Sequence, residues 1–175
     1  MDKITTTEIE TRVAGYFNYR KNIIVPNVSW GIGLHECDLL VIRDSGYAIE
    51  VEIKISKSDL RADAKKEHHH LSNRIKELYF AIPDYLEDCI EYIPERAGVL
   101  VLSRYQGGLS CYTKRKAKFN LNCRKFTQEE QLKVAHLGTM RIWNLKRQIK
   151  RETTKRKKER SISIKELQQD FHFAW

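Results

Sequence analysis

Three charged residues in the first third of the chain have the types and spacing needed for metal-assisted chemistry. Asp38 lies in one apolar run, and Glu52 and Lys54 lie in the next one. Carboxylates, together with water and substrate phosphate, are the ligands that Mg²⁺ prefers. A metal-bound water can then act as a nucleophile, and a nearby ammonium can orient it, deprotonate it or stabilise negative charge in the transition state. The three residues therefore predict hydrolysis of a phosphodiester.

The turn between the two apolar runs decides whether these side chains can meet. Asp44-Ser45-Gly46 contains turn-forming residues, and its glycine can adopt the positive φ that a three-residue hairpin loop requires. With such a loop the numbers of facing residues sum to 90, so Asp38 lies opposite Glu52. Period-two alternation places Lys54 on the same face. A two-residue loop would turn Asp38 to the other face, so the predicted site depends on the loop length.

Four further carboxylates are candidates for an additional ligand. Glu10 and Glu8 lie in a predicted first helix that runs from about residue 5 to 19. Each also fits a Thr-x-x-Glu capping box, which is the structural alternative. Glu50 shares the face of Glu52 one pair further along the hairpin, and Glu36 would face Lys54 as a ligand or as its salt-bridge partner.

The predicted elements alternate between strands and helices over most of the chain. A strand at 23–30, with a proline typical of an edge strand, precedes the hairpin, and a helix begins at Ser56 or Ser58 and runs through the histidines at 68–70. Three consecutive histidines cannot share one helix face, so they make a poor metal site. The remaining expectations are a strand at 78–82, a helix at 84–93, strands at 98–103 and 109–118, and a long helix from Thr127. This order predicts an α/β fold with a central mixed β-sheet flanked by helices on both faces.

Charge divides the chain into a nearly neutral body and a basic C-terminal extension. The net charge of +9 comes mostly from residues 141–160, which hold 10 Lys/Arg against 2 Asp/Glu. We therefore expect a core domain at 1–126 and, at 127–175, a long basic helix with an apolar tail. Such a block is typical of a nucleic-acid contact surface or of a solvated helix face. The predicted nucleic-acid contacts are Lys146, Arg147, Lys150, Arg151, Lys155, Arg156, Lys157 and Lys158.

Apolar residues in the last fifteen positions indicate that the tail packs on its own domain or on a second subunit, so a homodimer through the helix and tail is one possible assembly. The chain has no apolar run near ~20 residues and no N-terminal targeting pattern, which predicts a cytoplasmic protein without a membrane partner. The four cysteines are scattered, which favours free thiols over disulfides or zinc.

The arrangement of Asp38 and the Glu52-Ile53-Lys54 run resembles the active site of the PD-(D/E)XK nuclease superfamily. Helix, strand, Asp-bearing strand, turn, Glu-x-Lys strand and helix follow one another as in that superfamily's core, over about residues 5 to 105. Cys37 stands where the superfamily nominally has proline. The resemblance implies a restriction-endonuclease-like fold and an Mg²⁺ (or Mn²⁺) site at Asp38, Glu52 and Ile53. Holliday-junction-resolvase-like members add a Glu from the first helix, which here implies Glu10.

Two functions follow from these expectations. The first is a metal-dependent nuclease acting on DNA in repair, recombination or restriction, with Asp38, Glu52, Lys54 and Glu10 as catalytic residues. The second is a non-catalytic nucleic-acid-binding or assembly module that uses the basic C-terminal helix. Salt-sensitive binding is expected of both, so turnover separates them.

Overall fold

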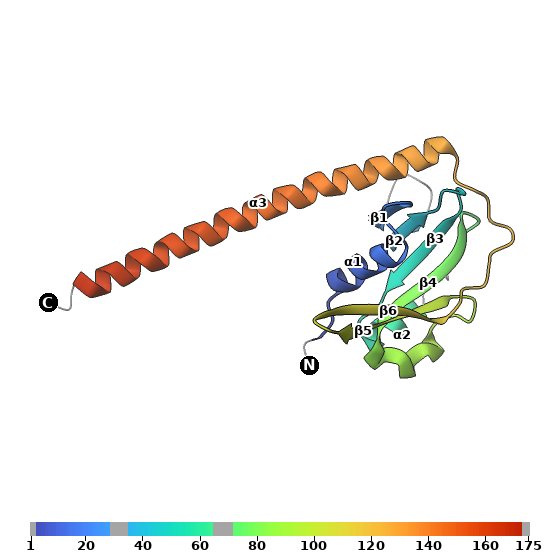
Figure 1. Cartoon of the computed structure of the whole chain (residues 1–175), viewed down its shortest axis with the longest axis horizontal. Coiled ribbons are helices and arrows are strands. Elements are labelled where there is room, and N and C mark those ends of the chain that lie inside the picture. Colours follow the sequence, from blue (N-terminus) through green and yellow to red (C-terminus); the bar gives the residue numbers. More distant parts are fainter. Residues whose placement is uncertain (1–2, 29–34, 65–71, 173–175) are drawn as a thin grey trace. The chain divides into compact units, whose positions relative to one another are not determined.

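The computed structural model describes residues 3–28, 35–64 and 72–172, with side chains described up to residue 159. It divides into two compact units, Met1–Gly138 and Thr139–Trp175. The elements (Figure 1) are α1 (Thr6–Tyr16), β1 (Ile23–Val28), β2 (Cys37–Ile42), β3 (Ala48–Ile53), α2 (Lys57–Asp63), β4 (Ile75–Pro83), the 3₁₀-helix η1 (Asp84–Tyr92), β5 (Gly98–Tyr105), β6 (Gly108–Arg115) and α3 (Gln128–His172).

The first unit is built on one mixed sheet whose strand order follows the sequence, β1-β2-β3-β4-β5-β6. The pairs β1–β2, β2–β3 and β5–β6 are antiparallel, whereas β3–β4 and β4–β5 are parallel. Parallel neighbours need a crossover, which α2 and η1 provide. The predicted α/β class with a mixed sheet is confirmed, and so is the edge position of β1.

The β2–β3 hairpin has the three-residue loop that the sequence predicts. The amide of Arg43 donates to the carbonyl of Tyr47 at 3.0 Å, the amide of Gly46 donates to the carbonyl of Arg43 at 2.8 Å, and Gly46 has φ +82°. The pairs Leu39–Val51, Leu40–Glu50, Val41–Ile49 and Ile42–Ala48 follow. Each pair sums to 90, so the predicted register is confirmed.

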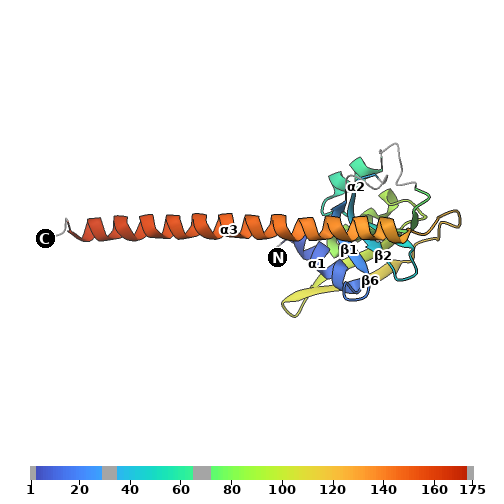
Figure 2. The ribbon, with the colours of Figure 1, turned by 90° about the horizontal axis from the view of Figure 1, so that it is seen from above.

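Helices cover both faces of the sheet, and Figure 2 shows α1 and α2 on opposite sides. On one face, the odd-numbered hairpin residues pack against Ile9 and Val13 of α1. On the other, Leu60 of α2 and Leu86 of η1 pack against β4 and β5. The polar residues at the C-terminal end of β3 therefore face the α2 side, because they alternate with the residues that contact α1.

Several boundaries differ from the sequence predictions. α1 ends at Tyr16, about three residues early, because Phe17 is already its C-cap. The predicted helix at 84–93 is a 3₁₀-helix, whose N-cap, Pro83, makes no side-chain capping bond. The histidines at 68–70, and Trp30 with the Gly31-Ile32-Gly33 loop, lie outside the described residues.

The boundary between the units lies within α3, at Gly138, rather than at residue 126. Phe126 and Val134 belong to the core of the first unit, packed with residues of β1, β2 and β3. A Cβ atom added at Gly138 would lie 3.2 Å from a methyl of Val25 on β1. The first turns of α3 are thus part of the sheet domain.

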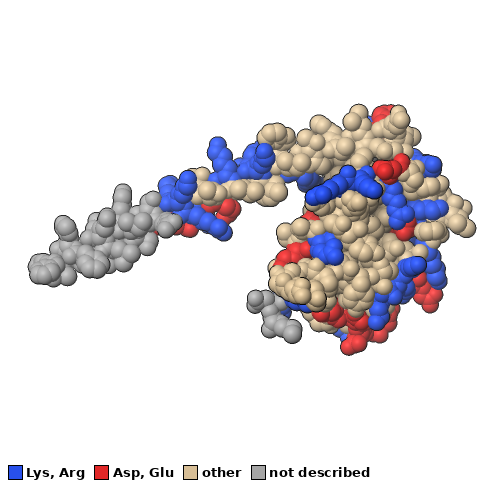
Figure 3. Space-filling model, viewed as in Figure 1, with Lys and Arg blue, Asp and Glu red and all other residues tan. Residues whose placement is uncertain are grey.

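The second unit is a continuation of α3 whose described side chains are exposed up to Glu159. Lys and Arg follow the helix in Figure 3, interrupted by a few acidic side chains. Large apolar side chains are exposed between them, at Met140, Ile142, Trp143, Leu145 and Ile149. The described part of this helix therefore exposes both charged and apolar side chains.

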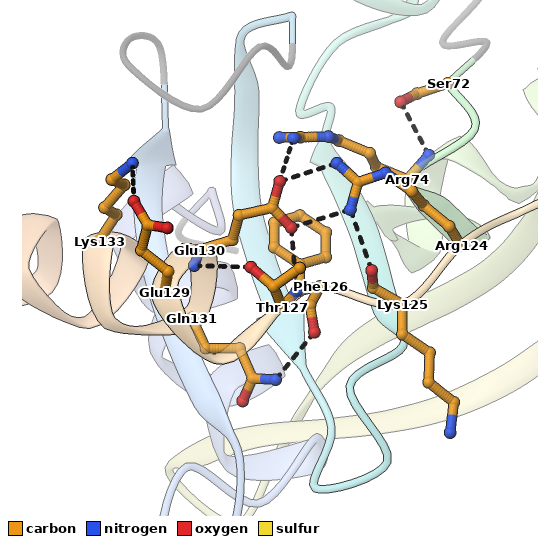
Figure 4. Close-up of polar contacts among 10 residues, drawn as sticks. All are labelled: Ser72, Arg74, Arg124, Lys125, Phe126, Thr127, Glu129, Glu130, Gln131 and Lys133. Carbon is orange, nitrogen blue, oxygen red and sulfur yellow. Dashed lines mark hydrogen bonds and ion pairs between the residues drawn. The ribbon is translucent and has the colours of Figure 1, made fainter.

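A capping box begins α3, as the sequence predicts. The amide of Glu130 donates to the hydroxyl of Thr127 at 3.2 Å, and the amide of Thr127 donates back to the Glu130 carboxylate at 2.9 Å. Arg74 and Arg124 also donate to this carboxylate (Figure 4). The network ties the start of α3 to the segment before β4.

No helix among the described residues is long and apolar enough to cross a membrane. All four cysteines are free thiols, with Cys37 and Cys89 buried.

Candidate active site

The candidate site is centred on the ammonium of Lys54, which three carboxylates share. Its Nζ lies 2.7 Å from Glu52 Oε2, 3.1 Å from Asp63 Oδ1 and 3.9 Å from Asp38 Oδ2. The sequence prediction that Asp38, Glu52 and Lys54 converge is thus matched by the geometry, and α2 adds Asp63.

The end of β3 positions Lys54 and Asp38 through main-chain contacts. The Lys54 amide donates to the Ala81 carbonyl at 3.1 Å, which extends the parallel pairing with β4 past the last strand residue. The Ile53 amide donates to Asp38 Oδ2 at 2.7 Å. The side chain of Asp38 therefore takes the place of a ladder acceptor and is held beside Lys54.

The local sequence of α2 explains the position of Asp63. Ser56 caps the helix by accepting from the Asp59 amide at 3.2 Å. Leu60 and Asp63 are three residues apart, so they share one helix face, and both are buried. The leucine packs into the core, and this anchoring brings the carboxylate to Lys54.

Burial of these charges indicates function more than stability. Glu52 and Asp63 are 2% and 5% exposed, whereas 36% of the Asp38 side chain is exposed. Transfer of each ion from water costs several kcal/mol, and apolar residues of similar volume often stabilise a fold as well or better. A buried charged cluster with one carboxylate open to solvent is typical of a site that meets a charged ligand.

The pKa of Lys54 bears on which chemical roles this side chain can have. Burial disfavours its charge, but attraction to and a hydrogen bond with Glu52, followed by attraction to Asp63 and Asp38, outweigh burial and raise the Lys54 pKa. A base role requires the pKa to fall toward neutrality. The geometry therefore fits an ammonium that orients a ligand or stabilises negative charge.

Glu10, rather than Glu8, is the helix carboxylate associated with the site. Glu8 forms the capping box with Thr5 and pairs with Arg104 at 2.6 Å, and these contacts lower its pKa to about 2. The alternative Thr7/Glu10 box does not form. Burial, and then repulsion from Asp38, raise the Glu10 pKa. Glu10 is therefore partly buried and close enough to Asp38 for the two charges to repel.

Glu50 forms a second buried contact beside the cluster. It is fully buried opposite Leu40, and its Oε1 lies 2.8 Å from Nε2 of His35. Glu36 is exposed, and the ion pairs of Lys54 go to other carboxylates, so the predicted Glu36–Lys54 pair is replaced by the pair with Asp63.

Sequence reasoning did not identify Asp63 or His35. Asp63 had a possible signal, since it follows an apolar helix residue at a spacing of three in the helix after the Glu-x-Lys strand. His35 carries no such signal, because the contact depends on how the chain enters β2.

The donor set suits a hard divalent cation with few protein ligands. Within the part of the chain that the structure describes, no group of three or more His, Cys, Asp or Glu side chains is placed to hold a metal ion. Mg²⁺ commonly uses one or two carboxylates and keeps waters and substrate phosphate as its other ligands. Asp38 and Glu52, with the Ile53 main chain between Glu52 and Lys54, fit that smaller set.

The fold and the site define an α/β protein with a mixed six-stranded sheet, a long C-terminal helix and a lysine–carboxylate cluster at the end of β3. A scan against protein-family models gives no match, and no curated protein matches the chain. Among solved structures, the SPO1766 protein of unknown function from Silicibacter pomeroyi is similar, with a TM-score of 0.58 and 17% sequence identity over 86% of this chain and 94% of that one. The similarity extends to the fold alone.

Proposed function

We propose that the protein is a metal-dependent nuclease that hydrolyses phosphodiester bonds in DNA, in repair, recombination or restriction. The observation that carries the proposal is the convergence of Asp38 and Glu52 on the ammonium of Lys54. The confirmed hairpin register brings them together from two strands. Their order on those strands supports the resemblance to the PD-(D/E)XK superfamily and, with it, a restriction-endonuclease-like core.

Asp38 and Glu52, with the Ile53 main chain, would hold Mg²⁺ or Mn²⁺. Such an ion supplies Lewis acidity and a reactive bound water. The protonated Lys54 stabilises the negative charge that builds on the phosphate, and such a contact contributes about 10²–10³-fold in rate. Glu10 would add a carboxylate near Asp38, since burial and then the charge of Asp38 raise its pKa.

The basic helix of the second unit is proposed to contact DNA phosphates. Exposed side chains on one stretch of it lie next to one another, namely Arg147, Lys150, Arg151, Thr154, Lys155 and Lys158. Neighbouring side chains at these positions offer several ammonium and guanidinium groups to one backbone segment. Exposed Ile142, Leu145 and Ile149 have a three–four spacing that also suits a second copy of the helix, so a homodimer is part of the proposal.

The same exposed basic surface favours a second candidate, a non-catalytic nucleic-acid-binding or assembly module. Both functions predict binding that weakens with salt. They differ in turnover, because only the nuclease needs the buried cluster of the first unit.

The test is cleavage of labelled single-stranded, duplex and branched DNA by the purified protein with Mg²⁺ or Mn²⁺. Glu52→Gln and Lys54→Ala should each reduce cleavage about 10²-fold or more at a temperature where both variants stay folded. The matched control is Glu130→Gln, a carboxylate of the α3 cap, which should cleave like the parent. Equal cleavage by the parent and both site variants would contradict the proposal, and binding without cleavage would favour the second candidate.

A further inference from the structure

The first unit has a second basic surface, although the net charge of the unit is close to zero. Residues 96–128 contain eight Lys/Arg and no Asp or Glu. This segment includes β6 and the stretch that links it to α3. Figure 3 shows Lys and Arg side chains along the right-hand edge of the unit, where Figure 1 places this linking stretch.

Two lysines and two aromatic rings are gathered at this surface. Lys76 Nζ lies 4.8 Å from the ring centroid of Tyr47 and 5.4 Å from that of Phe119. Lys125 Nζ lies 5.2 Å from the Tyr47 centroid. Cation–π contact at these distances holds ammonium groups beside the rings without neutralising them. The four residues form what we call the Phe119 platform.

The backbone behind the platform is held in place by hydrogen bonds. The Asn120 amide donates to the Lys76 carbonyl at 2.9 Å, and its side-chain amide donates to the carbonyls of Ser72 and Ile75 at 3.0 and 3.1 Å. Further along, the Phe126 amide donates to the Gly46 carbonyl at 2.8 Å. The linking stretch is therefore anchored at both ends, and its exposed side chains are presented from a fixed backbone.

Two large apolar side chains are exposed among the charged and polar side chains of this stretch. Phe119 is 60% exposed and Leu121 is 85% exposed. Leaving a large aromatic ring in water forgoes about 1.5–3 kcal/mol of burial. An exposed ring beside an ammonium group is the combination used to stack bases while cations contact the phosphate backbone.

We propose that the Phe119 platform binds single-stranded nucleic acid, with a base stacked on Phe119 and phosphates beside Lys76 and Lys125. The identification of that strand as DNA rests on the proposed nuclease function. Glu52 of β3 lies five positions after Tyr47, which at the rise of a strand is about 17 Å. The platform therefore contacts the strand away from the scissile phosphate and fixes the direction in which it leaves the site.

A stacked base can be detected by photo-crosslinking. The full-length protein is irradiated with a 12-nucleotide single strand carrying 5-iodouracil, in EDTA so that no cleavage occurs, and crosslinked peptides are identified by mass spectrometry. A crosslink at Phe119 or Tyr47 is expected. Crosslinks confined to the C-terminal helix, or a platform that binds phosphatidylserine vesicles and gives no crosslink, would overturn the proposal.

Affinity for the same strand provides the second readout. Phe119→Ala should weaken binding about 5- to 100-fold, whereas Phe119→Trp should retain it. The matched control is Tyr105→Ala, another exposed aromatic of the same unit, which should bind like the parent. An unchanged affinity for Phe119→Ala would contradict the proposal. Because neither readout needs turnover, a crosslink without cleavage would support the platform while contradicting the nuclease.

Discussion

The first unit contains two clusters of ionised side chains, and they differ in what they do for the fold. At the start of α3, Glu130 accepts from the Thr127 amide, Arg74 and Arg124, and each contact closes a helix end or ties down a segment (Figure 4). At the end of β3, Lys54 is shared by carboxylates from two strands and a helix that the hydrophobic core already holds together.

The pKa values of Glu130, in the α3 cluster, and Glu10, beside the Lys54 cluster, are shifted in opposite directions. The Arg124 hydrogen bond, then the Thr127 amide, lower the Glu130 pKa to about 2. Burial and then Asp38 raise the Glu10 pKa. The surroundings of Glu130 stabilise its charge through hydrogen bonds and nearby arginines. The surroundings of Glu10 disfavour its charge. The comparison teaches that a position near a cation is not enough to mark a site. At the candidate site, a neighbouring carboxylate, Glu10, has its charge disfavoured.

The largest expected contrast is between the central cations of the two clusters. Lys54→Met removes the ammonium shared by three carboxylates and should lower the free energy of unfolding by about 3–5 kcal/mol. Arg124→Met should lower it by less than about 1 kcal/mol, because Arg124 is half exposed and Glu130 keeps Arg74. Urea denaturation at pH 7 measures both values. Equal losses of stability in Lys54→Met and Arg124→Met would contradict the proposed difference between the two clusters.

A substitution in the hairpin turn should have the next largest effect on stability. The turn sets the register of the site, and its Gly46 carbonyl accepts a hydrogen bond from the Phe126 amide, which precedes α3. Gly46 has φ +82°, so Gly46→Ala should cost about 1–2 kcal/mol. Gly15→Ala, in helix α1, is the control and should be neutral or stabilising, because the added Cβ meets only the Arg12 side chain at an ordinary van der Waals distance of 3.9 Å. The midpoint of thermal unfolding should therefore fall for Gly46→Ala and should be unchanged or higher for Gly15→Ala.

Acid should reduce the contribution of Glu130 to stability, and the direction of this change follows from the lowered Glu130 pKa. This effect should be smaller than those above. The folded pKa of about 2 lies below the ordinary value of 4.5, so the contribution of Glu130 is complete above pH 4.5 and is lost as pH falls toward 2. Glu130→Gln should therefore be less stable than the parent at pH 7 and should approach it near pH 2. A difference that grows on acidification would contradict this assignment.

Glu10→Gln should change the free energy of unfolding in the opposite direction to Glu130→Gln, and by the smallest amount of these variants. The fold disfavours the Glu10 carboxylate, so neutral glutamine should leave stability at pH 7 equal to or above that of the parent. A clear loss of stability in denaturant titrations would mean that Glu10 has a structural partner, as Glu130 does.

The sequence predicted the features that short-range chemistry controls. Asp44-Ser45-Gly46 determined the loop and with it the register of the hairpin, and Thr127 determined the start of α3. It left Glu8 and Glu10 undecided, because both fit a capping box, and the hydrogen bonds between Thr5 and Glu8 assign Glu8 to the cap.

The remaining features depend on packing between distant segments. Asp63 reaches Lys54 only after α2 has docked through Leu60. The Phe119 platform joins residues 47, 76, 119 and 125, which no local pattern connects. The end of the sheet domain at Gly138 likewise follows from the fit of α3 on Val25.

The most direct test of the central claim is Mn²⁺ binding, measured by isothermal titration calorimetry without nucleic acid. If Asp38 and Glu52 form the metal site, Asp38→Asn and Glu52→Gln should each weaken binding about 10-fold or more, and Glu130→Gln should bind Mn²⁺ like the parent. Undiminished binding in both site variants, or an equal loss in Glu130→Gln, would contradict the account.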